Sequence, residues 1–454
     1  MKLTVIGGGG VRSMFLAKSI AQRAKSLYID KLVFMDNDEQ KLNIYGKMAK
    51  KVASLLCPSL DFEITTDAKK AVMDADYVIT TIREGGDEMR VQDERIALKY
   101  GVLGQETTGA AGLSFAMRSV SALKVYCELV KKYAKPNCKV FNFTNPAGVV
   151  SQTLRDMGYD FTYGICDAPS GMLRSFEKLY DAEEGSAKGE IYGLNHLSFF
   201  KSITINGKEI MDDLINNDLA YKQTDMRYFE KRLLKERNAV LNEYLYYFYY
   251  REQAVQNIIN ADKTRGEQIC EINKTMTEEL SKIDIDNDFE TAFKIFEHWY
   301  GIRENNYMAS ETGVKRENQW HFDIYQKDSG GYAGVALKFI EIAQSGKTDS
   351  MILCTANNGA ITGLRDDDIV EITCDITKDG TVPHKMGNID EQNLEIIRRV
   401  KIYERLSSKA IREQSIQAAV DALTLHPLVN SYSLAVKLIN DYLELNKEYV
   451  KEWK

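Results

Sequence analysis

Two side chains that bind divalent metals lie about thirty residues apart, at Cys166 and His196, each shortly after an apolar run (FTYGI and EIYGL). A thiolate and an imidazole can hold a metal together, and two protein ligands leave positions for substrate oxygens and water. Each residue alone is more often a packed core residue. The neighbours Asp167 and Asn195, together with a nucleotide-binding pattern at the start of the chain, favour a functional site.

The chain opens with a strand, a glycine turn and a helix. Residues 2–6 (KLTVI) lead into Gly7–Gly10, and VRSMFLAKSIAQRAK has the apolar spacing of a helix. This arrangement places backbone N–H groups and a helix N-terminus where a pyrophosphate binds. Arg12 stands at the third glycine of the usual motif, so the motif is imperfect. Asp36 ends the next apolar run, where an acidic residue binds the ribose hydroxyls of NAD.

Further apolar runs at 61–66, 75–82, 138–144 and 161–165 alternate with helical segments. This alternation predicts an α/β protein with a Rossmann-like, doubly wound parallel sheet. We expect an NAD-binding domain over residues 1–165, followed by an α+β domain over residues 166–454 for metal, substrate and oligomer contacts.

Two loops at the carboxyl ends of these strands carry polar side chains. Residues 81–109 include Arg83, Arg90 and the run 105–108, and Asn145 lies in the second loop. Ligands bind at this edge of open α/β sheets. We assign Arg90 and Asn145 to the crevice next to Cys166, and we expect ordinary polar surface positions for Glu88, Asp93 and Glu94.

The second half of the chain has a looser pattern. We predict aromatic packing at 241–250, a helix over 257–283, a helix over 329–344, strands at 351–361 and 368–376, a turn near 376–381, and helices from 389 to the end apart from 426–430. The charged, poorly patterned stretch within 284–330 favours a loop or a subunit contact.

Composition limits the function further. The 454 residues exceed one ordinary core and carry a net charge of −7, with a pI near 5.6. That charge argues against nucleic acid or an anionic membrane as a partner. The seven cysteines are scattered without CxxC spacing, which predicts no disulfide framework. We find no signal peptide or membrane span, and we expect a cytoplasmic protein.

These motifs resemble glycoside hydrolase family 4, the NAD- and metal-dependent glycosidases, and within it the 6-phospho-glucosidases. The resemblance covers nearly the whole chain through IGGGG, TIREGGDEMRVQDERIALKYGVLGQETTG, FNFTNPAG, GICDAP, YGLNHLSF, NEYLYYF followed by TRGEQ, TANNGAI, KIYERL and HPLVNS. The departures are Gly10 and Arg12 in the first turn, and Ala168 in CDAP.

The resemblance implies a role for each candidate residue. Cys166 and His196 ligate a divalent metal, usually Mn²⁺; Asp167 is the proton donor and Tyr244 the base. Arg90, Asn145 and Arg265 bind substrate. The residues expected at the NAD site are Gly7, Gly8, Gly9, Gly10, Val11, Arg12, Ser13, Asp36 and Arg83. Because free tyrosine has a pKa near ~10, a base at this position requires the metal or another cation close to Tyr244.

The implied reaction is hydrolysis of a phosphorylated disaccharide or an aryl 6-phosphoglucoside by NAD-dependent oxidation at carbon 3, deprotonation at carbon 2 and elimination. Asp167 is typical of the 6-phospho-α-glucosidases, whereas the wider motifs are more similar to the β enzymes, so we favour β. The family also implies a homodimer or homotetramer.

Two alternatives stay open at this point. A dehydrogenase of the lactate or malate type shares the nucleotide domain, but it needs a histidine acid/base and no cysteine ligand. A binding or regulatory protein that has lost catalysis is the other. The joint presence of Cys166, Asp167, His196, Tyr244 and Arg265 argues against it.

Overall fold

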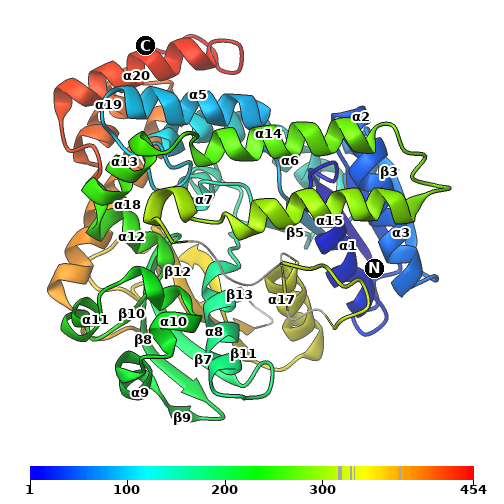
Figure 1. Ribbon diagram of the computed structural model, residues 1–454, viewed down its shortest axis with the longest axis horizontal. Coiled ribbons are helices and arrows are strands. Elements are labelled where there is room, and N and C mark those ends of the chain that lie inside the picture. The colour runs from blue at the N-terminus through cyan, green and yellow to red at the C-terminus, as the bar shows by residue number, and fades with distance from the viewer. Residues whose placement is uncertain (315–319, 328–329, 332, 378–379) are drawn as a thin grey trace.

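The structure is a computed structural model that describes residues 1–314, 320–327, 330–331, 333–377 and 380–454 (Figure 1). One sheet has the strand order β13-β12-β11-β6-β5-β4-β1-β2-β3, and a smaller sheet has the order β10-β8-β7, with β9 paired to β8. The strands are β1 (Lys2–Ile6), β2 (Lys31–Met35), β3 (Asp61–Thr65), β4 (Tyr77–Thr80), β5 (Lys139–Asn142), β6 (Thr162–Gly164), β7 (Ala187–Leu194), β8 (Leu197–Ile205), β9 (Lys208–Glu209), β10 (Val240–Leu241), β11 (Asp349–Ala356), β12 (Ile369–Thr377) and β13 (Gly380–Pro383).

The helices of the first half are α1 (Ser13–Arg23), α2 (Glu39–Lys41), the π-helix η1 (Leu42–Gly46), α3 (Lys47–Leu56), α4 (Ala68–Val72), α5 (Gly86–Lys99), α6 (Ala111–Tyr133), α7 (Ala147–Asp156), α8 (Ala168–Leu179), α9 (Met211–Asn216), α10 (Ala220–Gln223) and the 3₁₀ helix η2 (Asp225–Tyr228). Those of the second half are α11 (Lys231–Arg237), the 3₁₀ helix η3 (Glu243–Leu245), α12 (Tyr246–Tyr249), α13 (Arg251–Asn260), α14 (Arg265–Leu280), α15 (Phe289–Asn305), α16 (Ala309–Thr312), α17 (Gly334–Ser345), α18 (Glu391–Glu413), α19 (Ile416–Leu425) and α20 (Tyr432–Asn446).

The predicted doubly wound sheet is confirmed. Strands β6, β5, β4, β1, β2 and β3 pair in parallel. Their apolar runs are buried on both faces because helices cover each side. Residues of α1, α3 and α17 pack on one face, and residues of α4 and α6 pack on the other. The carboxyl ends of these strands therefore meet at one edge of the sheet.

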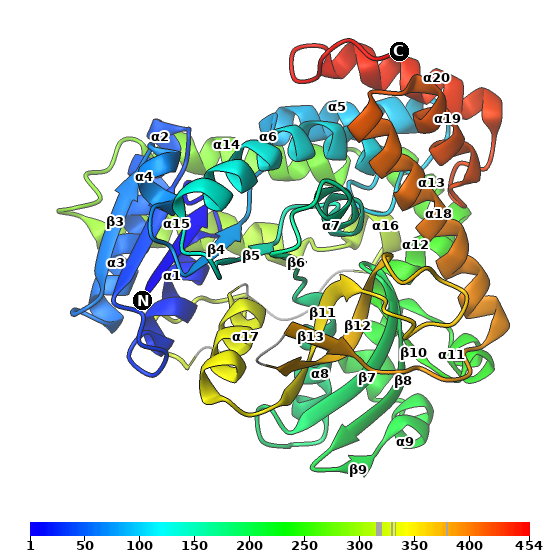
Figure 2. The same ribbon diagram turned by 180° about the vertical axis from the view of Figure 1, so that it is seen from behind.

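The sheet continues beyond β6 with strands from the second half of the chain. Strand β11 pairs antiparallel with β6 through Cys354 and Gly164, and β12 and β13 follow antiparallel. The smaller sheet is tied to β12, because Ile191 N–H donates to Thr373 Oγ1 at 2.9 Å. Figure 2 shows β11–β13 next to β7 and β8, at the opposite end from β3. The predicted division at residue 165 stays a prediction.

The second half differs from the predictions in two places. Residues 289–305, which lie within the range 284–330 that was expected to include a loop or subunit contact, form helix α15, because Ala292, Phe296 and Tyr300 recur at helical spacing and are buried. The single helix expected over 257–283 is broken between α13 and α14. Thr264 caps α14 in a capping box with Glu267, which fixes Arg265 as the first helical residue.

The prediction for the C-terminal region of this half is confirmed. Helices α18, α19 and α20 confirm the helical C-terminal region, with its break at 426–430. Part of the predicted turn near 376–381, at Lys378 and Asp379, lies outside the described residues, as do Ser329 and Tyr332 in the helical prediction over 329–344. No helix in the described part of the chain is long and apolar enough to cross a membrane.

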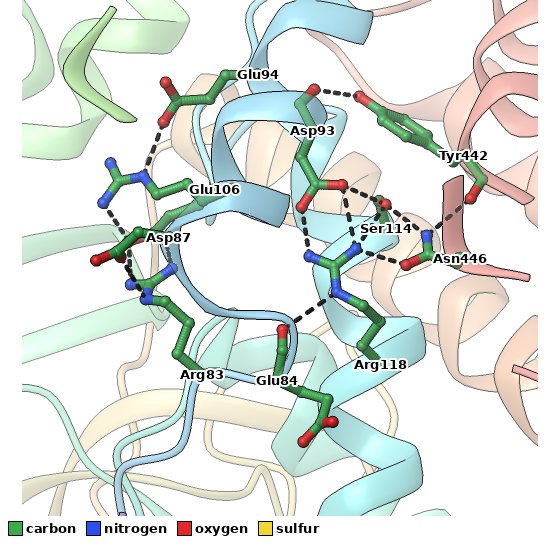
Figure 3. Close-up of polar contacts among 11 residues, drawn as sticks. Arg83, Glu84, Asp87, Asp93, Glu94, Glu106, Ser114, Arg118, Tyr442 and Asn446 are labelled. Atoms are coloured by element: carbon green, nitrogen blue, oxygen red, sulfur yellow. Dashed lines mark hydrogen bonds and ion pairs between the residues drawn. The ribbon is translucent and has the colours of Figure 1, made fainter. Parts of the chain in front are cut away.

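A buried ion pair joins the first half of the chain to its last helix. Arg118 on α6 pairs with Asp93 on α5, with 2.5 Å between Nη2 and Oδ2, and its Nη1 donates to Asn446 Oδ1 on α20 at 2.6 Å. Ser114 Oγ donates to Asp93 Oδ1 at 2.6 Å (Figure 3). The prediction that Asp93 lies at the surface is therefore wrong, because its charge is neutralised inside the protein.

Removing the cation from this pair should destabilise the fold. Arg118→Met leaves the Asp93 carboxylate buried and unpaired, so we expect the free energy of unfolding to fall by about 3–5 kcal/mol. Urea denaturation measures this loss. Arg232→Met removes an exposed ion pair with Glu236 and should change stability by less than about 0.5 kcal/mol. Equal stability of the two variants would contradict the role of the buried pair.

Candidate active site

A cavity of about 730 Å³ lies at the carboxyl edge of the parallel sheet. Its lining brings together residues that are far apart in the sequence, from the glycine turn to the loops after β4, β5 and β6 and helices α14 and α15. The sequence-predicted residues that line it are Gly7, Gly9, Gly10, Val11, Arg12, Asp36, Arg83, Arg90, Asn145, Cys166, Asp167, His196, Tyr244 and Arg265. Gly8 and Ser13 belong to the same turn but are not among the lining residues.

The glycine turn has little room for side chains. Gly7 has a φ of 97°, and a Cβ on it would lie 2.4 Å from the carbonyl oxygen of Thr81. A Cβ on Gly8 would lie 2.6 Å from the Cβ of Phe34, and Ser13 Oγ donates to the Gly8 carbonyl at 2.7 Å. Asp36 Oδ2 accepts from Gly9 N–H at 2.9 Å. This cradle, with an acidic residue at the end of β2, fits a dinucleotide.

Cys166 and His196 meet in the cavity. Cys166 follows β6, and His196 lies with Asn195 in the turn between β7 and β8, so each side chain is placed by the end of a strand. The distance between Cys166 Sγ and His196 Nε2 is 3.5 Å. Burial lowers the pKa of His196 to about 3, which keeps the imidazole neutral, as a metal ligand must be. This donor set fits a divalent metal.

The surrounding residues orient the pair without adding a third ligand. Glu371 on β12 accepts from Asn195 Nδ2 at 3.0 Å and from Ser198 Oγ at 2.8 Å, which holds the turn on both sides of His196. Among the described residues, no group of three His, Cys, Asp or Glu side chains is arranged to hold a metal. Substrate or water oxygens would therefore have to complete the shell.

Tyr244 stacks on His196, with 3.7 Å between ring centroids and 8° between planes. Tyr244 therefore lies against one of the two predicted metal ligands, and its closeness to a metal stays a prediction. Tyr307 Oη donates to Tyr244 Oη at 3.0 Å. Burial, and secondarily the charge of Glu243, raise the pKa of Tyr244 above its usual value. Tyr307 and Glu243 were not predicted as site residues from the sequence, because no motif assigned either of them a role.

Asp167 is the residue before α8 and lines the cavity. Burial raises the pKa of its carboxyl group, and the positive charges of Arg12 and Arg174 oppose this rise. Both arginines line the cavity. Arg12, which replaces a glycine of the usual turn, therefore contributes its charge to the active site, and Arg174 is a residue that the sequence analysis missed.

The arginines after β4 are held by carboxylates. Arg90 Nε donates to Glu94 Oε1 at 2.9 Å, and Arg83 Nη1 donates to Glu106 Oε2 at 2.5 Å (Figure 3). Arg83 and Arg90 hold the pKa of Glu106 well below its usual value despite burial. Glu94 was expected at the surface, which is wrong, because it is buried between Arg90 and the N–H of Gly266.

The fold and the cavity together define an α/β protein whose glycine turn opens onto a cysteine–histidine pair next to a partly buried tyrosine. The sequence profile of the family 4 glycosyl hydrolases matches residues 2–182, and the profile of the family 4 glycosyl hydrolase C-terminal domain matches residues 191–429. The chain belongs to glycosyl hydrolase family 4.

Known proteins match the chain over its whole length. A probable 6-phospho-beta-glucosidase of Bacillus subtilis is 28% identical, over 100% of this chain and 98% of that protein. The 6-phospho-beta-glucosidase structure of Thermotoga maritima with manganese, NAD⁺ and glucose-6-phosphate has a TM-score of 0.82 at 28% identity, covering 100% of both chains. A 6-phospho-alpha-glucosidase structure from gut microorganisms, with NAD and glucose-6-phosphate, has a TM-score of 0.84 at 26% identity, also covering 100% of both chains.

Removing either donor should abolish metal binding while the fold survives. We expect Cys166→Ser and His196→Ala to bind Mn²⁺ more than about 100-fold more weakly, measured by calorimetry, because each variant loses one of the two protein ligands. The circular dichroism spectrum should not change, because two ligands at a crevice add little to the core. Cys270→Ser and His298→Ala, which alter residues outside the cavity lining, are matched controls. Wild-type affinity in either cavity variant would refute the ligand assignment.

Proposed function

We propose that this protein hydrolyses 6-phosphoglucosides and prefers the β-linked ones. The observation that carries the proposal is the meeting of Cys166, His196 and Tyr244 in the cavity that begins at the glycine turn. The T. maritima relative, whose structure contains manganese, NAD⁺ and glucose-6-phosphate, supports the same assignment for this chain.

The cofactor-binding residues follow from their places in the cavity. The turn from Gly7 to Ser13, together with Asp36 and Arg83, would hold NAD⁺, and Cys166 and His196 would hold Mn²⁺. When bound, the dinucleotide accepts a hydride from carbon 3, and the metal polarises the sugar oxygens and favours the phenolate of Tyr244.

Tyr244 is proposed to remove the proton from carbon 2 of the sugar. Its ring is fixed against His196, and the hydrogen bond from Tyr307 stabilises the phenolate oxygen. Asp167 is proposed to protonate the glycosidic oxygen, because burial favours its neutral, proton-bearing form. Tyr244 would thus act as the base at carbon 2, and Asp167 as the acid at the glycosidic oxygen.

The substrate's phosphate is proposed to bind at Arg90, Asn145 and Arg265. Guanidinium groups suit a dianionic phosphate because they donate two parallel hydrogen bonds. The anomeric preference is a finer assignment. The β relatives are 27–29% identical to this chain and the α relatives 24–26%, whereas Asp167 is the feature typical of the α enzymes. We favour the β-linked substrates because more of the sequence motifs resemble those of the β enzymes.

Paired chromogenic substrates test this function. Purified protein with NAD⁺ and Mn²⁺ is assayed on nitrophenyl 6-phospho-β-glucoside, its α-linked counterpart and the unphosphorylated β-glucoside. We expect the fastest release of nitrophenol from the first. Activity on the α-linked substrate alone would overturn the anomeric preference, and equal rates with and without phosphate would overturn the phosphate site.

Cofactor removal gives a further prediction. Protein treated with EDTA and freed of dinucleotide should lose nearly all turnover, and NAD⁺ with Mn²⁺ should restore it. Because the hydride returns to the sugar, absorbance at the NADH wavelength should not grow with product. One equivalent of NADH per product would instead identify a dehydrogenase, and full activity without cofactors would exclude the proposed chemistry.

A further inference from the structure

A second buried guanidinium lies next to Arg265. Helix α15 ends at Asn305, and the side chain of Arg265, at the start of α14, reaches its last turn, where Arg265 Nη2 donates to the backbone carbonyl oxygen of Arg303 at 2.8 Å. The two residues are 8% and 7% exposed, and both line the cavity. Two positive charges are thus held next to each other with little access to water.

These two arginines make no direct ion pair with another described residue, although the charges of Glu311 and Asp87 reach them through the cavity. Arg83 and Arg90 form ion pairs with Glu106, whereas Arg265 and Arg303 form none with any carboxylate in the described part of the chain. Arg265 Nη1 and Arg303 Nε are buried, with no hydrogen-bond partner among the described residues. Burial, and next the charge of Arg303, lower the pKa of Arg265. A buried pair of like charges is costly unless an anion neutralises it.

At the start of α14, an anion would be bound by side chains and not by the N–H groups of the helix. The first N–H groups of a helix often hold a phosphate, but Gly266 N–H at the start of α14 already donates to Glu94 Oε2 at 2.8 Å. Arg303 is held in position by its ring contact with Tyr300, at 5.3 Å from the ring centroid, and by Asn273, whose Nδ2 donates to Asp87 Oδ2 at 2.6 Å and whose Oδ1 lies 3.5 Å from Arg303 Nη1.

We propose that Arg303 is a specificity-determining residue that binds the phosphate monoester of the sugar substrate together with Arg265. This inference rests on the proposed function. A phosphate dianion would neutralise both guanidinium groups and accept from the unpartnered Arg265 Nη1 and Arg303 Nε. The dinucleotide pyrophosphate is the other anion of the same chemistry, but the glycine turn and the start of α1 already supply its site.

Binding measurements on Arg303 variants separate these two anions. Calorimetry with glucose 6-phosphate should show at least about tenfold weaker binding to Arg303→Gln, because a charge-assisted hydrogen bond is lost. NAD⁺ affinity should stay within about twofold of wild type. Arg303→Lys keeps the positive charge but loses the bidentate donor, so its affinity for glucose 6-phosphate should lie between those of wild type and Arg303→Gln. It also replaces the glutamine variant in the test if that variant does not fold. Arg232→Gln is the exposed control.

Unchanged glucose 6-phosphate affinity in both Arg303 variants would overturn the inference, as would a loss confined to NAD⁺. Two further outcomes distinguish this inference from the proposed function. A wild-type protein that binds glucose 6-phosphate through Arg303 but hydrolyses neither anomer would overturn only the function. A wild-type protein that hydrolyses phosphoglucosides with no effect of Arg303→Gln on KM would overturn only the inference.

Discussion

Desolvation of ionisable side chains in one cavity is the constraint on which the rest of the structure depends. The carboxyl ends of parallel strands meet at one edge, so the cavity gathers residues from widely separated parts of the chain. Away from water, the pKa of a histidine falls, the pKa of a carboxylic acid without a close cation rises, and neighbouring arginines are stabilised by an anion. The same burial therefore prepares His196 as a ligand, Asp167 as an acid and Arg265 with Arg303 as an anion site.

The fold must offset the free-energy cost of burying these ionisable groups, and helix α5 contributes to this because its buried charged residues are paired. One side of α5 faces the cavity with Asp87 and Arg90, whereas Asp93 turns to Arg118 and Asn446 (Figure 3). The cavity wall is thereby connected through buried, satisfied polar groups to the C-terminal helix α20. Because each buried charge along α5 has a partner, the wall can hold Arg90 in place without a ligand.

The sequence allowed the parallel sheet to be predicted because its strands are short apolar runs that end in glycine or polar residues. It also indicated that Cys166 and His196 would meet, since each follows such a run. Arg303 was missed because α15 carries its apolar residues among many charges and looked like a loop. The burial of Asp93 and Glu94 was missed because their partners, Arg118 and Gly266, lie far along the chain. The oligomeric state and the cytoplasmic location stay predictions.

The most direct test of the account is hydrolysis in D₂O. If Tyr244 removes the carbon-2 proton, its hydroxyl exchanges with solvent before protonation is reversed, so mass spectrometry and NMR of the glucose 6-phosphate product should show deuterium at carbon 2. Tyr244→Phe should retain NAD⁺ and metal binding but lose most turnover. Product formed by the wild-type protein with only hydrogen at carbon 2 would contradict the central claim.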